Sequence, residues 1–453
     1  MIDSLGKISI VKMATRYARN LIPLKTLLGK DFFRKLDFLE KSQWWSSQEL
    51  ENYQNEHLQA LIHHAYNNVP YYHEVFRTNK LTPSDIHTVH DLPKLPILTK
   101  DIVRARVDDL KAKNFKDNDL IRSGTSGTTG TPLVFFTDQK LKVSGFHGPF
   151  IWRHFGWGGH RIGERRAIMS GWALADRRPV FYHPVNRVLV LSSYTLNPVS
   201  AELYARKLRS YRIQYIEAYP SIIGLFTRLL KDRNIARPVD MKAIFCFAEY
   251  LSDWQREEIE SFWGCECFDR YGLNEGVVQG IECEKHEGLH LASEYGITEF
   301  IDNENGYKNI VATGLTNYAM PFIRYETGDI GRLSERKCSC ERGFPLFELS
   351  GGRRRNFAVG KDNAAIPIAN VTIPKVTDQV VEFQFIQEEK GKMTLRLVRK
   401  TGFRAEDLKK IEKELDEKFR DNLEVTIEFS DSVFKTANRK TPVFIQKLVN
   451  IQS

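Results

Sequence analysis

The stretch Ser123-Gly124-Thr125-Ser126-Gly127-Thr128-Thr129-Gly130-Thr131-Pro132-Leu133 concentrates glycines and hydroxyl side chains in one short segment. Glycine permits tight turns and a close approach of the backbone to a ligand, while hydroxyl and N–H groups donate to phosphate oxygens. No Lys-Ser/Thr pair follows the last glycine, so this is not a Walker loop. A flexible linker is the alternative interpretation, but linkers rarely lead into a strand such as Leu133 to Phe136. The pattern therefore favours a phosphate-binding loop.

The length and composition of the chain indicate a two-domain globular protein. Its 453 residues exceed what one ordinary core accommodates, and 42% hydrophobic with 27% charged residues is a globular balance. No stretch approaches the ~20 apolar residues that span a bilayer. The N-terminus has neither an apolar core nor a cleavage site typical of secretion. We expect a cytoplasmic protein without a transmembrane segment.

The net charge of +9 raises the question of a polyanionic partner. The basic residues are spread along the chain without an aromatic-and-basic recognition motif, so nucleic acid is not expected, and a small substrate such as ATP explains a positive cleft equally well. Residues 7–36 form a basic amphipathic stretch interrupted by Pro23. Peripheral contact with an anionic membrane is one interpretation. A helix packed on its own domain is the one we favour.

Hydrophobic periodicity predicts a helical N-terminal segment over about 1–115, including a helix over 48–66, followed by alternating strands and helices. The expected strands are 133–137, 187–192, 215–218, 243–247, 266–271, 290–295, 298–301, 309–313 and 330–333, and the expected helices are 199–211, 221–232 and 253–262. The last hundred residues predict strands over 380–387, 392–398 and 424–429 and a helix over 405–419. The fold class is therefore α/β: a large N-terminal domain of helix-covered sheets (1–351) and a small mobile α+β C-terminal domain (352–453).

Four further motifs follow the loop in order. They are Phe247-Ala248-Glu249, Tyr271-Gly272-Leu273-Asn274-Glu275, Arg324-Tyr325-Glu326-Thr327-Gly328-Asp329 and Lys435-Thr436-Ala437-Asn438-Arg439-Lys440. Taken singly, Glu275 reads equally as a surface carboxylate, Asp329 as a turn residue and Lys440 as part of a basic tail. Five motifs in one order across most of the chain resemble the adenylate-forming superfamily of acyl-CoA synthetases, adenylation domains and luciferases.

The resemblance implies a role for each motif. The loop residues Ser123, Thr125, Ser126, Gly127, Thr128 and Thr129 would bind the phosphates of ATP, with Thr128 also catalytic. Ala248 and Glu249 would lie against adenine, and Tyr271 would stack on it beside Gly272 and Asn274. Glu275 would hold Mg²⁺, which prefers oxygen ligands, and Asp329 would accept both ribose hydroxyls. Lys440 would bridge the substrate carboxylate and the phosphate as a point charge.

Within the superfamily, the chain most resembles the phenylacetate–CoA ligases and CapK-like proteins of polysaccharide biosynthesis. The segments that carry this likeness are 65–72, 95–100 and Ala218-Tyr219-Pro220-Ser221. Tyr219, Ser221 and Trp172 are the candidates for the acyl pocket.

The chain departs from the family pattern at two places. At the expected hinge, Gly352-Arg353-Arg354 is followed by Arg355-Asn356 instead of two carboxylates, although Arg353 still reaches toward ribose or phosphate. Arg439 replaces the glycine that normally precedes the catalytic lysine. Both changes concern the second half-reaction, acyl transfer after a domain movement, more than the ATP site.

The six cysteines all lie between Cys246 and Cys340, and the absence of a secretory signal argues against a disulfide framework. The family group shows the pattern seen in Cys283, His290, Cys338 and Cys340, and this resemblance implies a closed, structural Zn²⁺ site. His286 is a rival fourth ligand. Buried thiols without a metal are the alternative.

We conclude that the sequence predicts an AMP-forming ligase. It would activate a carboxylic acid with ATP and pass the acyl group to an acceptor, with coenzyme A as the leading one. Transfer to an amine of a sugar or amino acid is the runner-up. Two other hypotheses are a non-catalytic nucleotide-binding scaffold and a regulatory module that uses the basic N-terminal stretch.

Overall fold

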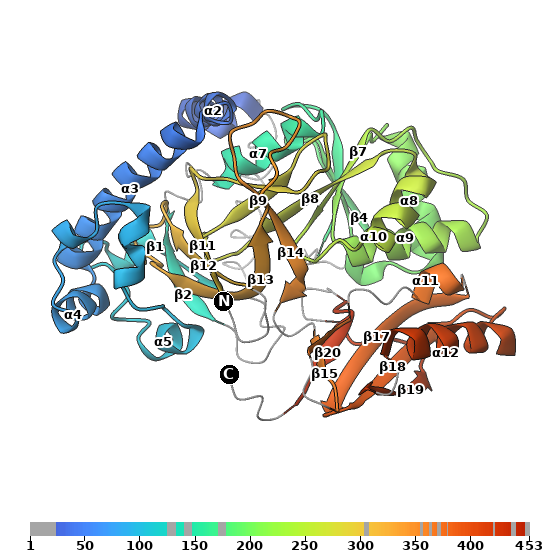
Figure 1. Cartoon of the computed structure of the whole chain (residues 1–453). Coiled ribbons are helices and arrows are strands. Elements are labelled where there is room, and N and C mark those ends of the chain that lie inside the picture. The colour runs from blue at the N-terminus through green and yellow to red at the C-terminus, as the bar shows by residue number, and fades with distance from the viewer. Residues whose placement is uncertain are drawn as a thin grey trace, which may run out of the picture.

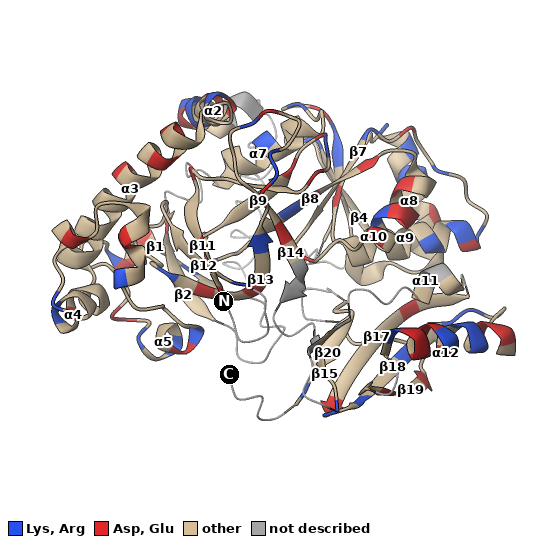
Figure 2. Cartoon of the chain, in the orientation of Figure 1, with Lys and Arg blue, Asp and Glu red and all other residues tan. Residues whose placement is uncertain are grey.

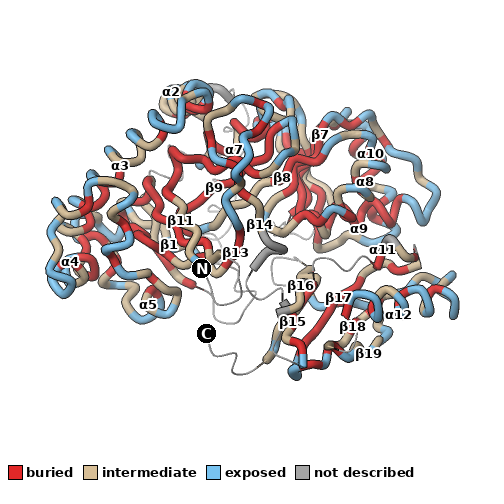
Figure 3. Tube along the Cα trace, viewed as in Figure 1, coloured by how far each residue is buried: buried red, intermediate tan, exposed pale blue. Residues whose placement is uncertain are grey.

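A computed structural model describes residues 24–124, 133–139, 147–170, 178–302, 308–353, 357–361, 365–368, 373–377, 379–419, 422–435 and 441–448. The chain forms a large unit, coloured blue to brown in Figure 1, and a small orange and red unit beside it. Buried residues concentrate on the strands of both units, whereas the helices expose their outer faces (Figure 3). Figure 2 shows charged residues of both signs distributed over the two units.

The N-terminal segment is helical from Leu24 onward, as predicted. Its helices are α2 (Leu24–Ser42), α3 (Ser47–Asn68), α4 (Pro70–Thr78) and α5 (Lys100–Ala105), with 3₁₀ turns at Pro83–Asp85, Val89–Lys94 and Asp117–Asp119. Ser46 begins α3 through a capping box with Glu49, and Pro70 starts the next helix because it cannot continue the previous one. The larger part of the basic stretch 7–36, residues 7–23, lies outside the described residues.

One twelve-stranded sheet forms the centre of the large unit. Its strand order is β11-β12-β13-β14-β10-β9-β8-β7-β6-β3-β5-β4. The strands are β3 (Arg166–Met169), β4 (Val180–His183), β5 (Val188–Leu191), β6 (Tyr215–Ala218), β7 (Ala243–Phe247), β8 (Glu266–Gly272), β9 (Gln279–Glu282), β10 (Leu289–Leu291), β11 (Gly296–Asp302), β12 (Lys308–Gly314), β13 (Tyr325–Leu333) and β14 (Leu346–Arg353). Strands β5, β3, β6, β7 and β8 are parallel neighbours, whereas the pairs from β8 to β11 are antiparallel.

Helices cover both faces of the parallel half. The apolar sides of α8 (Pro198–Ser210), α9 (Pro220–Asp232) and α10 (Asp253–Trp263) pack on one face around residues such as Ile216 and Ile244. Helix α7 (His147–Trp157) covers the other face, where Phe155 packs against Phe245 and Phe268. A hairpin of β1 (Leu120–Gly124) and β2 (Val134–Asp138) joins the core of the antiparallel half. Among the described helices, none combines the length and apolarity needed to cross a membrane.

The small unit is a four-stranded sheet, β19-β18-β17-β20, packed on a helix. It comprises β17 (Val380–Glu389), β18 (Lys392–Arg399), α12 (Ala405–Phe419), β19 (Glu424–Phe429) and β20 (Phe444–Gln446); α11 (Ile373–Val376) and the pair β15 (Phe357–Val359) and β16 (Ala365–Pro367) precede or flank it. Trp254 of α10 contributes to its core and lies 5.7 Å from the ring of Phe383. Arg228 of α9 donates to the carbonyl of Val381 at 2.7 Å.

The predicted α/β and α+β architecture is confirmed, and most elements agree with their predicted ranges within two residues. The strand expected over 290–295 is wrong in extent: β10 ends at Leu291, because Ala292 to Tyr295 form a turn closed by the N–H of Tyr295 on the carbonyl of Ala292. Helix α7 was not predicted. The division of the chain at 351/352 stays a prediction, and β14 extends to Arg353.

Replacing Gly296 with alanine should destabilise the protein. A Cβ atom at this position would lie 2.1 Å from the carbonyl oxygen of Val277 and 2.9 Å from that of Thr313, and backbone cannot yield as a side chain can. We expect a loss of about 3 kcal/mol or more in the free energy of unfolding. Gly156 is the matched control, because its Cβ would meet nothing within 4 Å; Gly156→Ala in α7 should stabilise by up to about 1 kcal/mol. Equal urea midpoints for the two variants would contradict this assignment.

Candidate active site

The glycine-rich segment connects two paired strands. Ser123 and Gly124 end β1, opposite Phe135 and Val134 of β2; residues 125–132 lie outside the described residues, so the phosphate-binding role of the loop stays a prediction. Asn274, in the turn after β8, donates through Nδ2 to the carbonyl of Gly124 at 3.4 Å. The described start of the loop therefore lies beside the Tyr271–Glu275 motif. Thr125, Ser126, Gly127, Thr128 and Thr129 lie outside the described residues.

Two tyrosine–carboxylate hydrogen bonds join the end of β8 to β13. The hydroxyl of Tyr271 donates to Asp329 at 2.9 Å, and the hydroxyl of Tyr325 donates to Glu275 at 2.8 Å. Both carboxylates are only 5% exposed, so the interpretation of Glu275 as a surface group is wrong. The backbone at Gly272 also lacks space for a side chain, because a Cβ there would lie 2.7 Å from the amide of Gln279.

Asp329 lies within β13, not in a turn before a strand. Its backbone N–H donates to the hydroxyl of Thr327 at 3.0 Å, and it is paired in register with Arg353 of β14 at an irregularity of the ladder. The backbone of Arg353 is thereby placed next to Asp329. Lys100 donates to the carbonyl of Thr327 at 2.5 Å from the start of α5. The segments around Arg353 and Lys100 therefore both contact the first half of β13, where the Arg324–Asp329 motif lies.

The Phe247-Ala248-Glu249 motif forms a sharp turn at the carboxyl end of β7. Ala248 has φ of +64°, a left-handed conformation that is unusual for a residue other than glycine and is frequent near ligands. Glu249 accepts from the N–H and the hydroxyl of Ser221, both at 3.0 Å, at the N-terminus of α9. The ring of Tyr219 lies 5.0 Å from that of Phe247. Tyr219 and Ser221 are therefore brought next to the adenine-binding candidates.

Two further predicted residues, Trp172 and Lys440, lie outside the described residues. Conversely, Arg324 and Leu98, to which the sequence analysis gave no role, make hydrogen bonds that hold the Arg324–Asp329 motif in place. Arg324 has φ of +52°, donates to both oxygens of Glu299 at 3.0 and 2.9 Å, and donates to the carbonyl of Leu95 at 2.5 Å. Leu98 pairs with the same motif through backbone hydrogen bonds. The sequence signal that could have identified them is that Arg324 and Leu98 both lie inside family-like segments, 324–329 and 95–100.

The thiols of Cys283, Cys338 and Cys340 and the imidazole of His290 gather at one place away from these motifs. One ligand atom from each residue lies within 4.8 Å of the others, and all four residues are buried. The two thiols of Cys283 and Cys338 are 3.6 Å apart, and Cys340 Sγ lies 3.5 Å from His290 Nε2. Burial raises the pKa of the Cys283 thiol and lowers the pKa of His290 to about 4.

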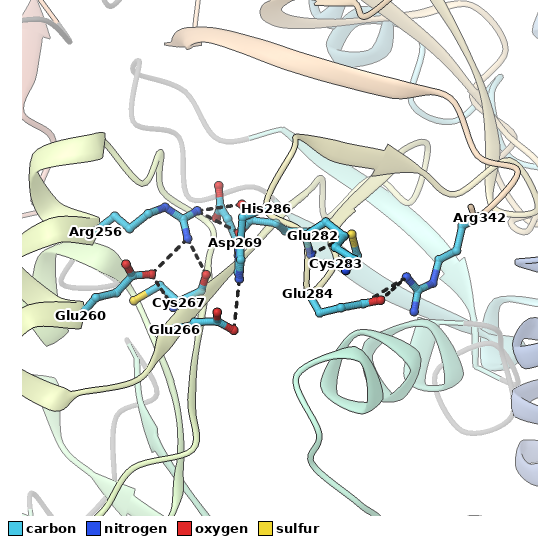
Figure 4. Close-up of polar contacts among 11 residues, drawn as sticks. Arg256, Glu260, Glu266, Cys267, Asp269, Glu282, Cys283, Glu284, His286 and Arg342 are labelled. Carbon is cyan, nitrogen blue, oxygen red and sulfur yellow. Dashed lines mark hydrogen bonds and ion pairs between the residues drawn. The ribbon is translucent and has the colours of Figure 1, made fainter. Parts of the chain in front are cut away.

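His286, the rival ligand, is engaged elsewhere. Its two ring nitrogens lie 3.4 Å from Glu266 and 3.3 Å from Glu282, as Figure 4 shows. The hydrogen bond to Glu282 raises the pKa of His286. Arg256 of α10 donates to both oxygens of Glu282 at 2.9 Å. This network fixes the segment next to Cys283, and it leaves His290 beside the thiols. The other cysteines, Cys246, Cys265 and Cys267, lie in or against the core under α8–α10.

Comparison with known proteins adds evolutionary evidence to this geometry. The family model of the CapK C-terminal domain matches residues 360–447. Protein CapK of Staphylococcus aureus is 26% identical over 400 residues, which cover 85% of this chain and 87% of that protein. Phenylacetate-coenzyme A ligase of Thermus thermophilus is 24% identical over 310 residues, 65% of this chain and 68% of that enzyme.

The chain is similar to CapK over most of its length and to phenylacetate–CoA ligases over about two thirds of it. These are the proteins of the adenylate-forming superfamily that the sequence motifs resemble most. The fold agrees: a crystal structure of 2-hydroxyisobutyryl-CoA ligase in the postadenylation state, in complex with R3-HIB-AMP, superposes with a TM-score of 0.69 and 16% identity. The match covers 89% of this chain and 90% of that one. The adenylate-forming fold thus accounts for both units.

Proposed function

We propose that this chain is an AMP-forming ligase that activates a carboxylic acid with ATP and passes the acyl group to coenzyme A. The observation that carries the proposal is the convergence of three motifs: Asn274 reaches the start of the glycine-rich loop, while Glu275 and Asp329 are both tied to the β8–β13 junction. Phosphate, metal and ribose candidates therefore lie around one site. The similarity to phenylacetate-coenzyme A ligases supports this reaction class.

The reaction would begin with attack of a substrate carboxylate oxygen on the α-phosphorus of ATP. The new P–O bond forms as the bond to the β-phosphate oxygen breaks, and pyrophosphate leaves. Developing negative charge requires positioned donors, a metal and a cation. Glu275 would hold Mg²⁺, which neutralises phosphate charge; its carboxylate is buried and oriented by Tyr325, as such a ligand needs. Asp329, oriented by Tyr271, would accept the ribose hydroxyls, and Lys440 would contact the reacting oxygens.

An amine of a sugar or amino acid is the second candidate acceptor. The C-terminal match to the CapK model and the identity to CapK over most of the chain favour it, together with Arg355 at a position where the family pattern has a carboxylate. Both candidates share the adenylation step.

We further propose that Cys283, His290, Cys338 and Cys340 bind a structural Zn²⁺. Tetrahedral geometry with Zn–S bonds of ~2.3 Å requires ligand atoms separated by about 3.8 Å, close to the 3.6 and 3.5 Å found here. Four protein ligands would close the site to solvent and to substrate. The ion would reverse the effect of burial on the thiols, since bound thiols are deprotonated.

Carboxylate-dependent exchange of labelled pyrophosphate into ATP tests the adenylation step. We expect the wild-type protein to catalyse exchange with at least one member of a broad acid panel. Asp329→Asn should lose about 100-fold or more in kcat/KM, because the amide nitrogen of asparagine donates and cannot accept a hydrogen bond from a ribose hydroxyl. Asp302, an exposed acid at the end of β11, provides the control Asp302→Asn, which should leave exchange unchanged. Absence of exchange across the panel would favour a scaffold.

Release of AMP under multiple turnover distinguishes the acceptors. With the acid identified by exchange, addition of coenzyme A should stimulate AMP release and yield a thioester detectable by mass spectrometry. Stimulation by amino sugars or amino acids, with none by coenzyme A, would instead select amide formation.

Metal analysis of purified protein tests the zinc site. The wild-type protein should contain about one zinc per chain, and Cys338→Ser should lose it and unfold at a lower temperature. Cys265→Ser is the matched control, because this half-buried thiol lies outside the cluster. Zinc content unchanged by Cys338→Ser would remove the site.

A further inference from the structure

Three charged side chains are buried together between α7 and the parallel strands. Glu217 of β6 is 7% exposed, and it lies 3.4 Å from Nη2 of Arg270 on β8 and 3.6 Å from Nε of Arg166 on β3. The side chain of Arg270 is 10% exposed and that of Arg166 17%. Two guanidinium groups therefore share one carboxylate, at distances longer than a close ion pair.

The ionisable groups around this cluster do not balance its charge. Burial and the positive charge of Arg270 lower the pKa of His147 to about 4, and the same two causes lower that of His154. Burial and Arg166 lower the pKa of His160 to about 3, and burial raises that of Tyr295 to about 12. All four side chains are therefore neutral at pH 7.

The nearest other carboxyl is on the opposite side of β8. The side chain of Asp269 accepts from the backbone N–H of Arg270 at 2.8 Å, and the backbone N–H of Asp269 donates to Glu282 of the Arg256–Glu282 network of Figure 4 at 2.7 Å. Burial and Glu282 raise the pKa of Asp269 to about 7. Within the cluster itself, two guanidinium groups share one carboxylate, and Asp269 also favours the charged form of Arg270.

A neighbouring buried ion pair contains one guanidinium and one carboxylate in close contact. Arg153 of α7 lies 2.8 Å from Glu294, and Ser42 also donates to that carboxylate. Arg270 lies further from its carboxylate, at 3.4 Å, and shares it with Arg166; its Nη1, like Nε and Nη2 of Arg153, makes no hydrogen bond to any described residue. An uncompensated buried charge costs several kcal/mol, so a structural role alone does not account for Arg270.

Arg270 lies at the edge of the sheet where ligands of parallel α/β sheets bind. It is two residues from the end of β8 and directly precedes Tyr271, and its guanidinium lies 5.1 Å from the ring centre of Phe247, the last residue of β7. Further from this edge, the aromatic residues Phe155, Tyr215, Phe245 and Phe268 fill the space beneath α7. Arg270 therefore contacts the candidate adenine-binding motif at Phe247, whose ring lies 5.0 Å from that of the acyl-pocket candidate Tyr219.

We infer that Arg270 is a specificity-determining residue that binds a second carboxylate on the acyl substrate, so that the acid is a dicarboxylic acid. This inference rests on the proposed function. One carboxylate would react with ATP. The other would form a charge-assisted pair with Arg270, so that each guanidinium of the cluster has a carboxylate partner. Glu217 would position the guanidinium of Arg270 through their ion pair, while Arg166 pairs with the same carboxylate.

The test compares dicarboxylic acids of graded chain length with their monomethyl esters in pyrophosphate exchange. The wild-type protein should prefer the diacid of the best-fitting length by about 30-fold or more in kcat/KM, because the ester leaves a buried cation unpaired. Arg270→Met should abolish this preference and retain exchange with the ester. Arg270→Lys should recover part of the preference, which a purely structural role would not produce. A diacid-to-ester ratio that is the same in wild type and Arg270→Met overturns the inference, while exchange itself still supports the ligase.

Thermal unfolding provides an independent measurement. Arg270→Met should unfold at the wild-type temperature or above, since Glu217 retains Arg166. At least one diacid of the graded series should raise the unfolding temperature of the wild type and not that of Arg270→Met, and this result does not require exchange activity, so it separates the inference from the ligase proposal. A strong loss of stability in Arg270→Met, with diacids and esters binding alike to Arg270→Lys and to wild type, would show that Arg270 is structural.

Discussion

The candidate site depends on a pair of crossed hydrogen bonds between tyrosines and acids. Tyr271 precedes Glu275 in one motif, and Tyr325 precedes Asp329 in another, yet each tyrosine donates to the acid of the other motif. Both acids are buried, so loss of either hydroxyl would leave a carboxylate short of a partner, which is costly in a low-dielectric setting. The reciprocal arrangement fixes the parallel half of the sheet relative to the antiparallel half. The loop hairpin joins this junction through Asn274.

The proposed zinc site at Cys283, His290, Cys338 and Cys340 lies apart from this junction, and its role would be structural. It connects the segment around Cys283 and His290 with the turn at Cys338 to Cys340, flanking the short strand β10. A strand of three residues contributes few ladder hydrogen bonds, so a metal bound by these four residues would compensate for its shortness. Glu287 adds hydrogen bonds to the N–H and hydroxyl of Ser339 across the same gap.

Much of the fold was predictable because local pattern and burial agree. Strands β6 and β7 and helix α12 have their predicted bounds, since apolar runs or amphipathic periodicity coincide with clear ends. Helix α7 was missed because aromatic residues, histidines and glycines mix within it without a polar face. The choice of His290 over His286 followed from resemblance, and geometry explains it: two acids already engage His286. The charged group around Glu217 was not predicted, because its members come from three strands far apart in sequence.

Helix α9 touches the candidate site at one end and the small unit near the other. Its first turn carries Ser221 against Glu249, and Arg228, two turns later, donates to a carbonyl of β17. The small unit also rests on the Trp254 ring and on an ion pair between Lys400 and Asp232. Val381 of β17 packs against the core under α8–α10 as well, so the joint combines polar contacts with a small apolar one. A movement of the small unit between half-reactions would break these few contacts, and their re-formation on α9 would align the returning unit with Ser221 at the other end of the same helix.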